Sequence, residues 1–245
     1  MCEVLVTAWA EPEPFARVLP WALQLERVGV AGFGWGVAWR EGDRVMGRRD
    51  PGRLSEDRQA QETLATVRST HFLVHLRRPS RLSTISLADT QPFVEEAGRF
   101  AFAHNGQLEG AAGARGRFSG QLAGRADSEV GFRLFEALLS QGRGEAEALA
   151  QVHAELGGRA NLAVLPAAGA ALVYAGNREN DFWRFRLEGA EVASTALHSA
   201  DQALFSLCFP DAQQPERVGW RQVVAVADQH PSQPGAAPAR ALAGG

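Results

Sequence analysis

A cysteine at position 2 is the first residue whose type and place suggest chemistry. Removal of Met1 would leave Cys2 with both a thiol and a free α-amine. The thiol has an ordinary pKa of ~8.5 and the α-amine one of about 7.7–8.0, so the amine can accept the thiol proton near neutral pH. Such a residue combines a nucleophile with its base. Met-Cys by itself also fits an ordinary start followed by a small side chain, so residues further along the chain decide between the two interpretations.

Three further motifs each allow a structural and a chemical interpretation. Asn105-Gly106 is the favoured pair for a two-residue hairpin turn, but an Asn side chain and a following backbone N–H can also stabilise an oxyanion. Arg77 is either part of a solvated basic strand edge or a fork that binds a carboxylate through two hydrogen bonds. Asp127 is either the N-cap of the helix that follows or an acceptor for a substrate ammonium.

Together these residues form a set suited to one kind of reaction. Arg77 and Asp127 would hold a glutamine-like substrate by its α-carboxylate and α-ammonium groups, while Cys2 attacks its γ-carboxamide. Asn105 and Gly106 would stabilise the oxyanion that forms. We therefore expect thiol-dependent hydrolysis of the γ-amide of glutamine or of a γ-glutamyl compound, through a γ-glutamyl thioester on Cys2.

Composition narrows the classes of partner. The 245 residues carry a formal net charge of −3, with 45% hydrophobic and 22% charged residues, which is ordinary for a globular protein. Such a charge gives no general attraction to nucleic acid or to an anionic membrane, and we expect neither as a partner. All 25 basic residues are arginine, which excludes lysine Schiff-base chemistry and a P-loop lysine.

The two cysteines are too few for a disulfide framework, and Cys208, between Leu207 and Phe209, fits a buried core residue. The sequence contains no secretory signal and no apolar run long enough to span a membrane. We therefore expect a cytoplasmic protein, in a reducing compartment that suits a working thiol. The histidines show no metal-ligand spacing, and we expect no metal.

Hydrophobic patterning predicts short strands with helices between them. Strands are expected at 4–8, 32–39, 71–77, 99–104, 160–165, 170–175, 182–187, 191–195 and 219–227, and a turn at 42–43 leads into a strand at 44–46. Helices are expected at 12–25, at 55–67 with Ser55 as N-cap, from Asp127 onward, at 145–156 and around 200–207. Loops are expected at 78–91 and 110–124. This order predicts antiparallel sheets with helices packed outside, as one domain over 1–230 with a disordered tail over 231–245.

Six segments within residues 1–140 resemble the class II glutamine amidotransferases, which are N-terminal-nucleophile (Ntn) hydrolases. The segments are Met1-Cys2-Glu3-Val4-Leu5, Gly34-Trp35-Gly36, His75-Leu76-Arg77, Thr90-Gln91-Pro92-Phe93, Phe102-Ala103-His104-Asn105-Gly106-Gln107-Leu108 and Ala126-Asp127-Ser128-Glu129. They occur in the family's order. The Asn-Gly and Asp-Ser-Glu segments are the more specific, and the C-terminal half is similar only in pattern.

The resemblance implies an α+β fold, a four-layer αββα sandwich of two antiparallel sheets, with the nucleophile at the start of an inner strand. It implies Cys2 as nucleophile with its α-amine as base, and Asn105 (side chain) with Gly106 (main chain) as the oxyanion hole. Arg77 would bind the substrate α-carboxylate and Asp127 the α-amino group. No cofactor is implied. The compact length is most similar to the stand-alone subgroup, which includes the γ-glutamyl-hercynylcysteine sulfoxide hydrolase of ergothioneine biosynthesis.

The sequence departs from this family around the loop expected to cover the substrate. Phe33 stands where many relatives have Asp or His, residues 78–82 lack a usual glycine, and Gln91 replaces the histidine of Thr-His-Pro-Phe. These changes leave the leaving group or ammonia acceptor open. Two alternatives remain: a glutaminase subunit that delivers ammonia to a separate synthase, and an amidase similar to the choloylglycine and penicillin acylases.

Overall fold

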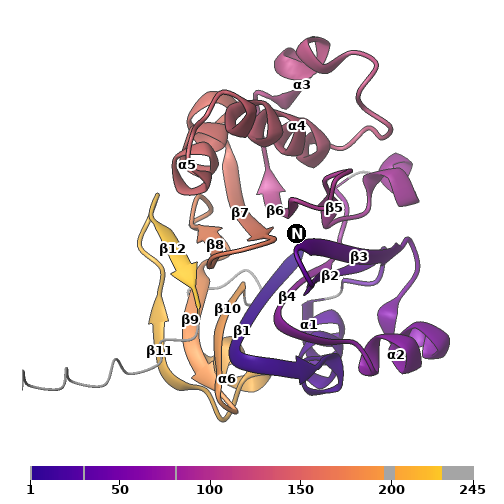
Figure 1. The fold of residues 1–245 in the computed structure, drawn as a ribbon, viewed down its shortest axis with the longest axis vertical. Helices are drawn as coiled ribbons and strands as arrows, with labels where there is room; N and C mark the ends of the chain where they lie inside the picture. Colours follow the sequence, from indigo (N-terminus) through magenta and orange to yellow (C-terminus); the bar gives the residue numbers. More distant parts are fainter. Residues whose placement is uncertain (1, 30, 81, 196–201, 228–245) are drawn as a thin grey trace, which may run out of the picture.

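The computed structural model describes residues 2–29, 31–80, 82–195 and 202–227. The described strands of one sheet are β1 (Glu3–Pro14), β2 (Trp35–Glu41), β3 (Arg44–Asp50), β4 (Arg68–Leu76), β9 (Phe182–Leu187), β10 (Ala190–Thr195) and β11 (Gln213–Arg217). Those of the other are β5 (Phe93–Val94), β6 (Phe100–Gln107), β7 (Arg159–Pro166), β8 (Ala171–Tyr174) and β12 (Val223–Val226). The strand orders are β11-β9-β10-β1-β4-β2-β3 and β12-β8-β7-β6-β5 (Figure 1). Every pairing between neighbouring strands is antiparallel.

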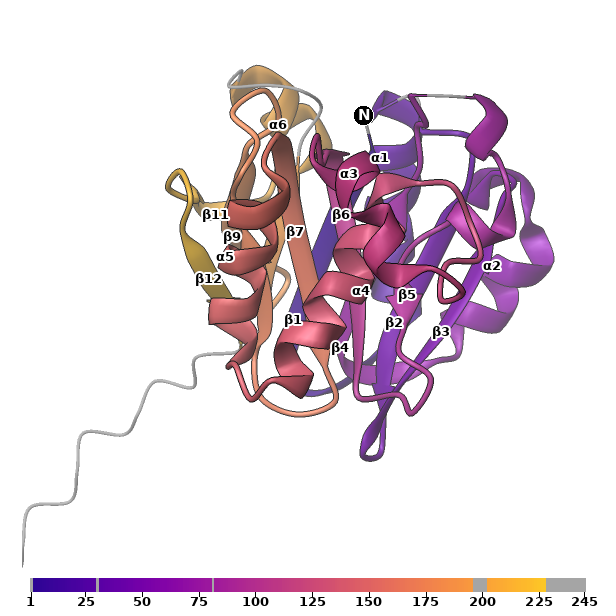
Figure 2. The same cartoon turned by 90° about the horizontal axis from the view of Figure 1, so that it is seen from above.

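Helices cover the outer face of each sheet (Figures 1 and 2). The seven-stranded sheet carries α1 (Leu19–Gly29), α2 (Arg58–Ala65) and α6 (Gln202–Cys208). The five-stranded sheet carries α4 (Asp127–Ser140) and α5 (Glu145–Leu156), and the short α3 (Ala111–Ala114) lies beside α4. The predicted α+β fold, a four-layer αββα sandwich, is therefore confirmed. None of the described helices is long and apolar enough to cross a membrane.

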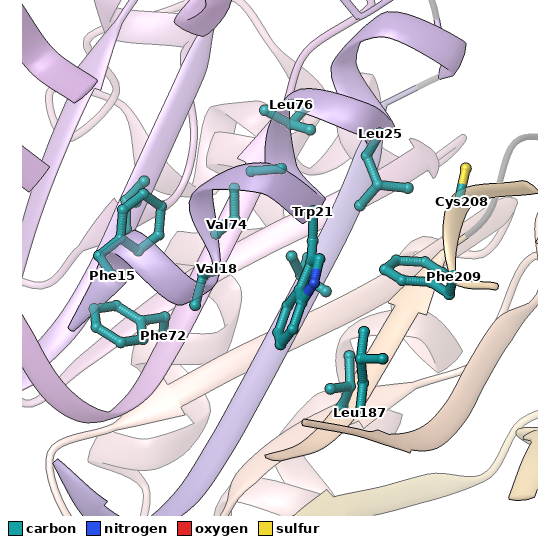
Figure 3. Close-up of a cluster of buried hydrophobic side chains, with 14 of the residues drawn as sticks. Phe15, Val18, Trp21, Leu25, Phe72, Val74, Leu76, Leu187, Cys208 and Phe209 are labelled. Carbon is teal, nitrogen blue, oxygen red and sulfur yellow. The ribbon is translucent and has the colours of Figure 1, made fainter. Parts of the chain in front are cut away.

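Three apolar clusters fill the three interfaces between these layers. Strand β1 contributes to two of them, because successive side chains of a strand point to opposite faces. Val4 and Val6 point between the sheets, whereas Leu5 and Trp9 point toward the layer of α1. Figure 3 shows part of the cluster between the seven-stranded sheet and its helices. Cys208 in this cluster is 5% exposed, so its predicted place in the core is confirmed. A strand buried on both faces explains the uninterrupted apolar run Val4-Leu5-Val6.

The first two predicted helices begin later than expected. Strand β1 continues to Pro14, which pairs with Arg68 after an irregularity in the register, and α1 begins at Leu19 after a 3₁₀ turn at Phe15–Arg17. Helix α2 begins at Arg58, and its N-cap is Asp57, which accepts the Ala60 N–H at 2.8 Å. The predicted cap, Ser55, lies in a 3₁₀ turn (Leu54–Glu56) held by Glu26, whose carboxylate accepts the N–H groups of residues 54 and 55 at 2.7 and 2.9 Å.

Other differences are smaller. The loop predicted at 110–124 contains α3 and a 3₁₀ turn (Arg115–Phe118), and the 78–91 loop contains 3₁₀ turns at Leu82–Thr84 and Leu87–Asp89. Strand β11 has no counterpart in the prediction, and the last strand is shorter than the predicted 219–227. The start of the helix predicted around 200–207 and the tail predicted from 231 lie outside the described residues, so the boundary at 230 stays a prediction. The remaining predicted strands and hairpins are confirmed.

Candidate active site

Strand register places Cys2 beside Arg77. β1 pairs antiparallel with β4, with Glu3 opposite Leu76, so the residue before Glu3 and the residue after Leu76 are neighbours. The next backbone N–H along, from Arg78, points at the Cys2 Sγ over 3.5 Å, and this sulfur lies 3.8 Å from the Arg78 carbonyl oxygen. Because β1 is paired on both sides, by β10 and β4, the segment that carries Cys2 is firmly held.

The surroundings of Cys2 favour the protonated form of its thiol. Burial raises its pKa, and the Arg78 N–H and the Arg77 guanidinium oppose that effect only in part. A thiol in this state needs a base at the moment of attack. Met1 lies outside the described residues, and its removal would place an α-amine on Cys2 itself.

Arg77 has the geometry of a carboxylate-binding residue. Its backbone is fixed by two hydrogen bonds, from its N–H to Gly34 O at 2.7 Å and from Phe33 N–H to its carbonyl at 3.1 Å. The guanidinium Nη2 donates to Thr84 Oγ1 at 2.8 Å. Nη1 is buried and has no hydrogen-bond partner among the described residues. A buried guanidinium with an open donor is well suited to an anionic ligand.

Asn105-Gly106 lies within a strand and forms no hairpin turn. In β6 these residues pair with Asn161 and Ala160 of β7. Gly106 has a φ of +121°, and a Cβ there would lie 1.9 Å from the Arg159 carbonyl oxygen, so only glycine fits. The buried Asn105 side chain donates from Nδ2 to the backbone carbonyl of Cys2. The amide of Asn105 thus lies directly beside Cys2.

Asp127 is the first residue of α4, and the helix has no side-chain N-cap hydrogen bond. Its Oδ2 instead accepts the Leu108 N–H at 2.8 Å, and its Oδ1 accepts the Ser128 N–H at 3.0 Å. The interpretation of Asp127 as an N-cap is therefore wrong. The half-buried carboxylate is tied to the segment that follows β6, which brings it near the Asn-Gly pair.

One cavity joins these groups. It has a volume of about 380 Å³, and Cys2, Arg77, Gly106 and Asp127 all line it. Four of the five predicted site residues therefore share one cavity. The fifth, Asn105, donates to the Cys2 carbonyl but does not line the cavity, and its role as an oxyanion donor stays a prediction. In the described part of the chain, no three His, Cys, Asp or Glu side chains are grouped to hold a metal ion.

The loop before β5 and strand β6 contribute further residues to the site. Gln91, where relatives have histidine, lines the cavity and accepts the His104 N–H at 2.6 Å. His104 also lines the cavity, and burial lowers its pKa although Asp127 acts in the opposite direction, so its ring is neutral at pH 7. Thr84 and Asp89 are buried in the same loop. The resemblance to the family predicted that this loop lies near the substrate, but not the buried positions of Thr84 and Asp89.

Solved structures of other proteins share this fold. Glutamine phosphoribosylpyrophosphate amidotransferase from B. subtilis, complexed with ADP and GMP, matches with a TM-score of 0.69 at 18% identity, over 91% of this chain and 47% of that chain. A glutamine aminotransferase class-II domain protein from Silicibacter pomeroyi gives 0.53 and 22%, over 79% and 88%. A predicted glutamine amidotransferase from Pseudomonas aeruginosa gives 0.50 and 17%, over 92% and 93%. This chain thus spans about half the length of the first of these proteins.

The sequence model of the class II glutamine amidotransferases matches residues 1–201. The chain therefore belongs to the class II glutamine amidotransferase family. Enzymes of this family hydrolyse the side-chain amide of glutamine, so the expectation of an amide-hydrolysing enzyme is confirmed at the level of the family. No match was found among curated proteins.

Proposed function

We propose that this protein hydrolyses the γ-amide of glutamine or of a γ-glutamyl compound through a γ-glutamyl thioester on Cys2. The observation that carries the proposal is the shared cavity, in which a thiol, a buried guanidinium and a carboxylate face one space. A glutamyl group carries a carboxylate and an ammonium at one end and a carbonyl at the other. Arg77, Asp127 and Cys2 supply the complementary group for each of them.

The proposed reaction proceeds in two steps. Cys2 Sγ attacks the γ-carbonyl carbon while the thiol proton passes to the α-amine, and the oxyanion is stabilised by the Gly106 N–H and Asn105 Nδ2. The C–N bond then breaks, and ammonia or an amine leaves with that proton. Water next attacks the thioester and releases glutamate and the thiol. The raised pKa of Cys2 supports this order, because the thiol would lose its proton during attack and not before it.

A second candidate is a glutaminase subunit that delivers ammonia to a separate synthase. The length comparison favours this candidate, because the chain covers only 47% of an amidotransferase with a similar fold.

An amidase for apolar acyl groups fits the cavity less well, because its lining includes the charged side chains of Arg77 and Asp127. The assignment to the stand-alone subgroup that acts on γ-glutamyl-hercynylcysteine sulfoxide is part of the proposal.

The test compares the unaltered protein with Cys2→Ala on glutamine and a panel of γ-glutamyl amides that includes γ-glutamyl-hercynylcysteine sulfoxide. We expect release of glutamate by the unaltered protein and none by the variant. Mass spectrometry after acid quenching should find a γ-glutamyl adduct on the N-terminal peptide, which should lack Met1. Cys208→Ala is the matched control and should retain activity. Full activity of Cys2→Ala would exclude the proposal, and activity that requires a co-purifying synthase would favour the second candidate.

A further inference from the structure

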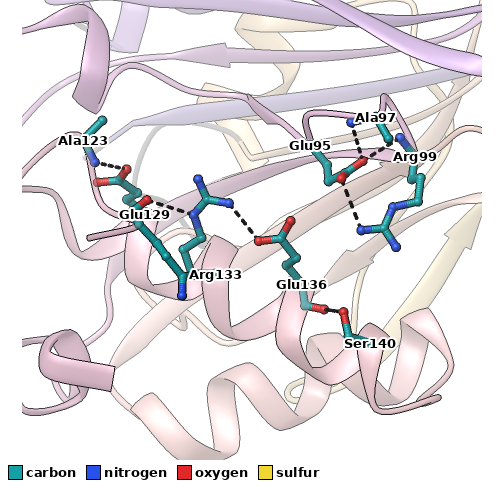
Figure 4. A network of polar contacts seen from close by, with 9 residues as sticks. Glu95, Ala97, Arg99, Ala123, Glu129, Arg133, Glu136 and Ser140 are labelled. Atoms are coloured by element: carbon teal, nitrogen blue, oxygen red, sulfur yellow. Dashed lines mark hydrogen bonds and ion pairs between the residues drawn. The ribbon is translucent and has the colours of Figure 1, made fainter. Parts of the chain in front are cut away.

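The segment before Asp127 is held by carboxylates to an unusual degree. Residues 123–126 present four consecutive backbone N–H groups, and two buried carboxylates accept all four. Glu129 accepts the first two at 2.7 and 2.8 Å (Figure 4), and Asp89 Oδ1 accepts the last two at 2.5 and 2.6 Å. Asp89 and Glu129 are only 2% and 4% exposed. Hydrogen bonds to an ionised acceptor are stronger than neutral ones, so this segment has little freedom to move.

Two further residues complete the arrangement. A Cβ at Gly124 would lie 2.3 Å from Asp89 Oδ1, so the close approach of the carboxylate depends on glycine at this position. Arg115 donates to the carbonyl oxygens of Gly124 and Ala126 from the other side. The peptide that leads into Asp127 is thus fixed through both its N–H and its C=O groups.

The loop that carries Asp89 also contacts Arg77. Ser86 Oγ donates to Asp89 Oδ2 at 2.9 Å, and Thr84, a few residues earlier in the same loop, accepts from the Arg77 guanidinium at 2.8 Å. One loop is therefore hydrogen-bonded both to Arg77, proposed to bind the substrate carboxylate, and to the peptide before Asp127, proposed to bind the substrate ammonium.

We propose that Asp89 is a positioning residue for recognition of the substrate ammonium, and that it acts through Asp127. The inference rests on the proposed function and deepens it. Asp89 is not among the residues that line the cavity, and both of its carboxylate oxygens already accept hydrogen bonds. Direct contact with substrate is thereby assigned to Asp127, while Asp89 fixes where Asp127 stands relative to Arg77.

The test uses a substrate that lacks the ammonium. Glutaric acid monoamide is glutamine without its α-amine, so it has no group for Asp127 to bind. For Asp89→Asn we expect KM for glutamine to rise roughly tenfold with kcat changed less than about twofold, because one charge-assisted contact is weakened. The kcat/KM for glutaric acid monoamide should stay within about twofold of the unaltered protein. An equal loss on both substrates, or no loss on either, would overturn the inference.

Two variants separate positioning from general stability. Glu95 is also a buried carboxylate that accepts two backbone N–H groups, from Ala97 and Arg99, but it lies near the opposite end of β6 (Figure 4). Glu95→Gln should lower the melting temperature and leave both KM values unchanged. Gly124→Ala keeps Asp89 intact but displaces its carboxylate, so it should reproduce the selective rise in KM for glutamine even if Asp89→Asn fails to fold.

Hydrogen exchange gives a readout that does not depend on activity. The amides of residues 125 and 126 should exchange faster in Asp89→Asn than in the unaltered protein. Unchanged exchange would overturn this inference but not the proposed function. An unaltered protein without activity on glutamine or any γ-glutamyl amide would overturn the proposed function, and the inference with it.

Discussion

Asn161 fixes the orientation of Asn105 from the neighbouring strand. Its Oδ1 accepts the N–H groups of Gly176 and Asn177, both at 3.1 Å, which turns its Nδ2 toward Asn105 Oδ1 at 3.3 Å. Asn105 consequently presents its own Nδ2 to the Cys2 residue. The orientation of the proposed oxyanion donor is thus set by a residue that does not line the cavity.

Replacement of Asn105 tests its role in the transition state. We expect Asn105→Ala to lower kcat by roughly 10²- to 10³-fold, the usual loss for one oxyanion donor, with a much smaller change in KM. Steady-state kinetics with glutamine would measure both constants. Asn161→Ala, which leaves Asn105 in place but removes its support, should lose less. A KM effect without a kcat effect would contradict an oxyanion role.

Arg77→Lys keeps the charge but removes the planar fork and its bond to Thr84. We expect kcat/KM for glutamine to fall roughly 10- to 100-fold, because lysine cannot make two parallel hydrogen bonds to a carboxylate. 4-Aminobutanamide, which is glutamine without its α-carboxylate, provides the comparison and should be hydrolysed equally by both proteins. If the variant loses activity on both compounds to the same extent, Arg77 has another role.

Gly106→Ala should damage the fold as well as the site. The new Cβ would meet the Arg159 carbonyl at 1.9 Å, at a φ of +121°, and strain with overpacking of this kind typically costs about 1–3 kcal/mol each. Denaturant unfolding would measure the loss of stability. Gly113→Ala is the matched control, because a Cβ there meets nothing within 4 Å and alanine favours the helix. Equal stability of the two variants would be evidence against the β6–β7 geometry.

The raised pKa of Cys2 predicts slow alkylation at neutral pH. Only the thiolate reacts with iodoacetamide, and burial keeps the pKa of Cys2 above its ordinary value. A free cysteine reaches its maximum alkylation rate once the pH is well above its ordinary pKa. The alkylation rate of Cys2 should still increase at such a pH. The measurement should use Cys208→Ala, so that only one thiol is present. A rate that is already maximal at pH 7 would indicate a thiolate and refute this prediction.

Acid should destabilise the protein through its buried histidines. Burial, with Arg40 acting in the same direction, lowers the pKa of His71 to about 3. The unfolded chain, with an ordinary histidine pKa of ~6.5, then holds more protons, so this stability is complete above that pH and is lost as the pH falls toward 3. Between pH 4 and 6, His71→Gln should reduce the slope of unfolding free energy against pH by about 1.4 kcal/mol per unit. An unchanged slope would show that His71 is already protonated in the fold.

Local patterns predicted most strands, because the alternation of apolar and polar residues and the turn residues that end a strand lie within a few positions of one another. The fold and four of the cavity residues followed from short motifs. Asn105-Gly106 shows the limit of such reasoning: its sequence is that of a hairpin turn, but its partner strand begins at Arg159 and cannot be read from the neighbouring residues.

The contacts that hold the site were harder to predict for the same reason. Asp89 binds backbone N–H groups of residues 125 and 126, and Glu26 binds those of residues 54 and 55. A carboxylate that binds a distant backbone leaves no periodicity and requires no particular partner side chain. The N-cap of α2 is a local feature of the sequence, but Ser55 is as suitable an N-cap residue as Asp57, which is the one observed.

The place of β1 between β4 and β10 determines when the surroundings of Cys2 can be completed during synthesis. Leu5 is paired with Ser194, and the Val4 N–H donates to the Thr195 hydroxyl. The partner strand β10 has therefore not yet been synthesised when β1 leaves the ribosome. Cys2 is thus synthesised well before β10, the strand that completes this part of its sheet. In a nascent chain the Cys2 thiol therefore lies beside an incomplete sheet until translation has passed residue 195 and β10 pairs with β1.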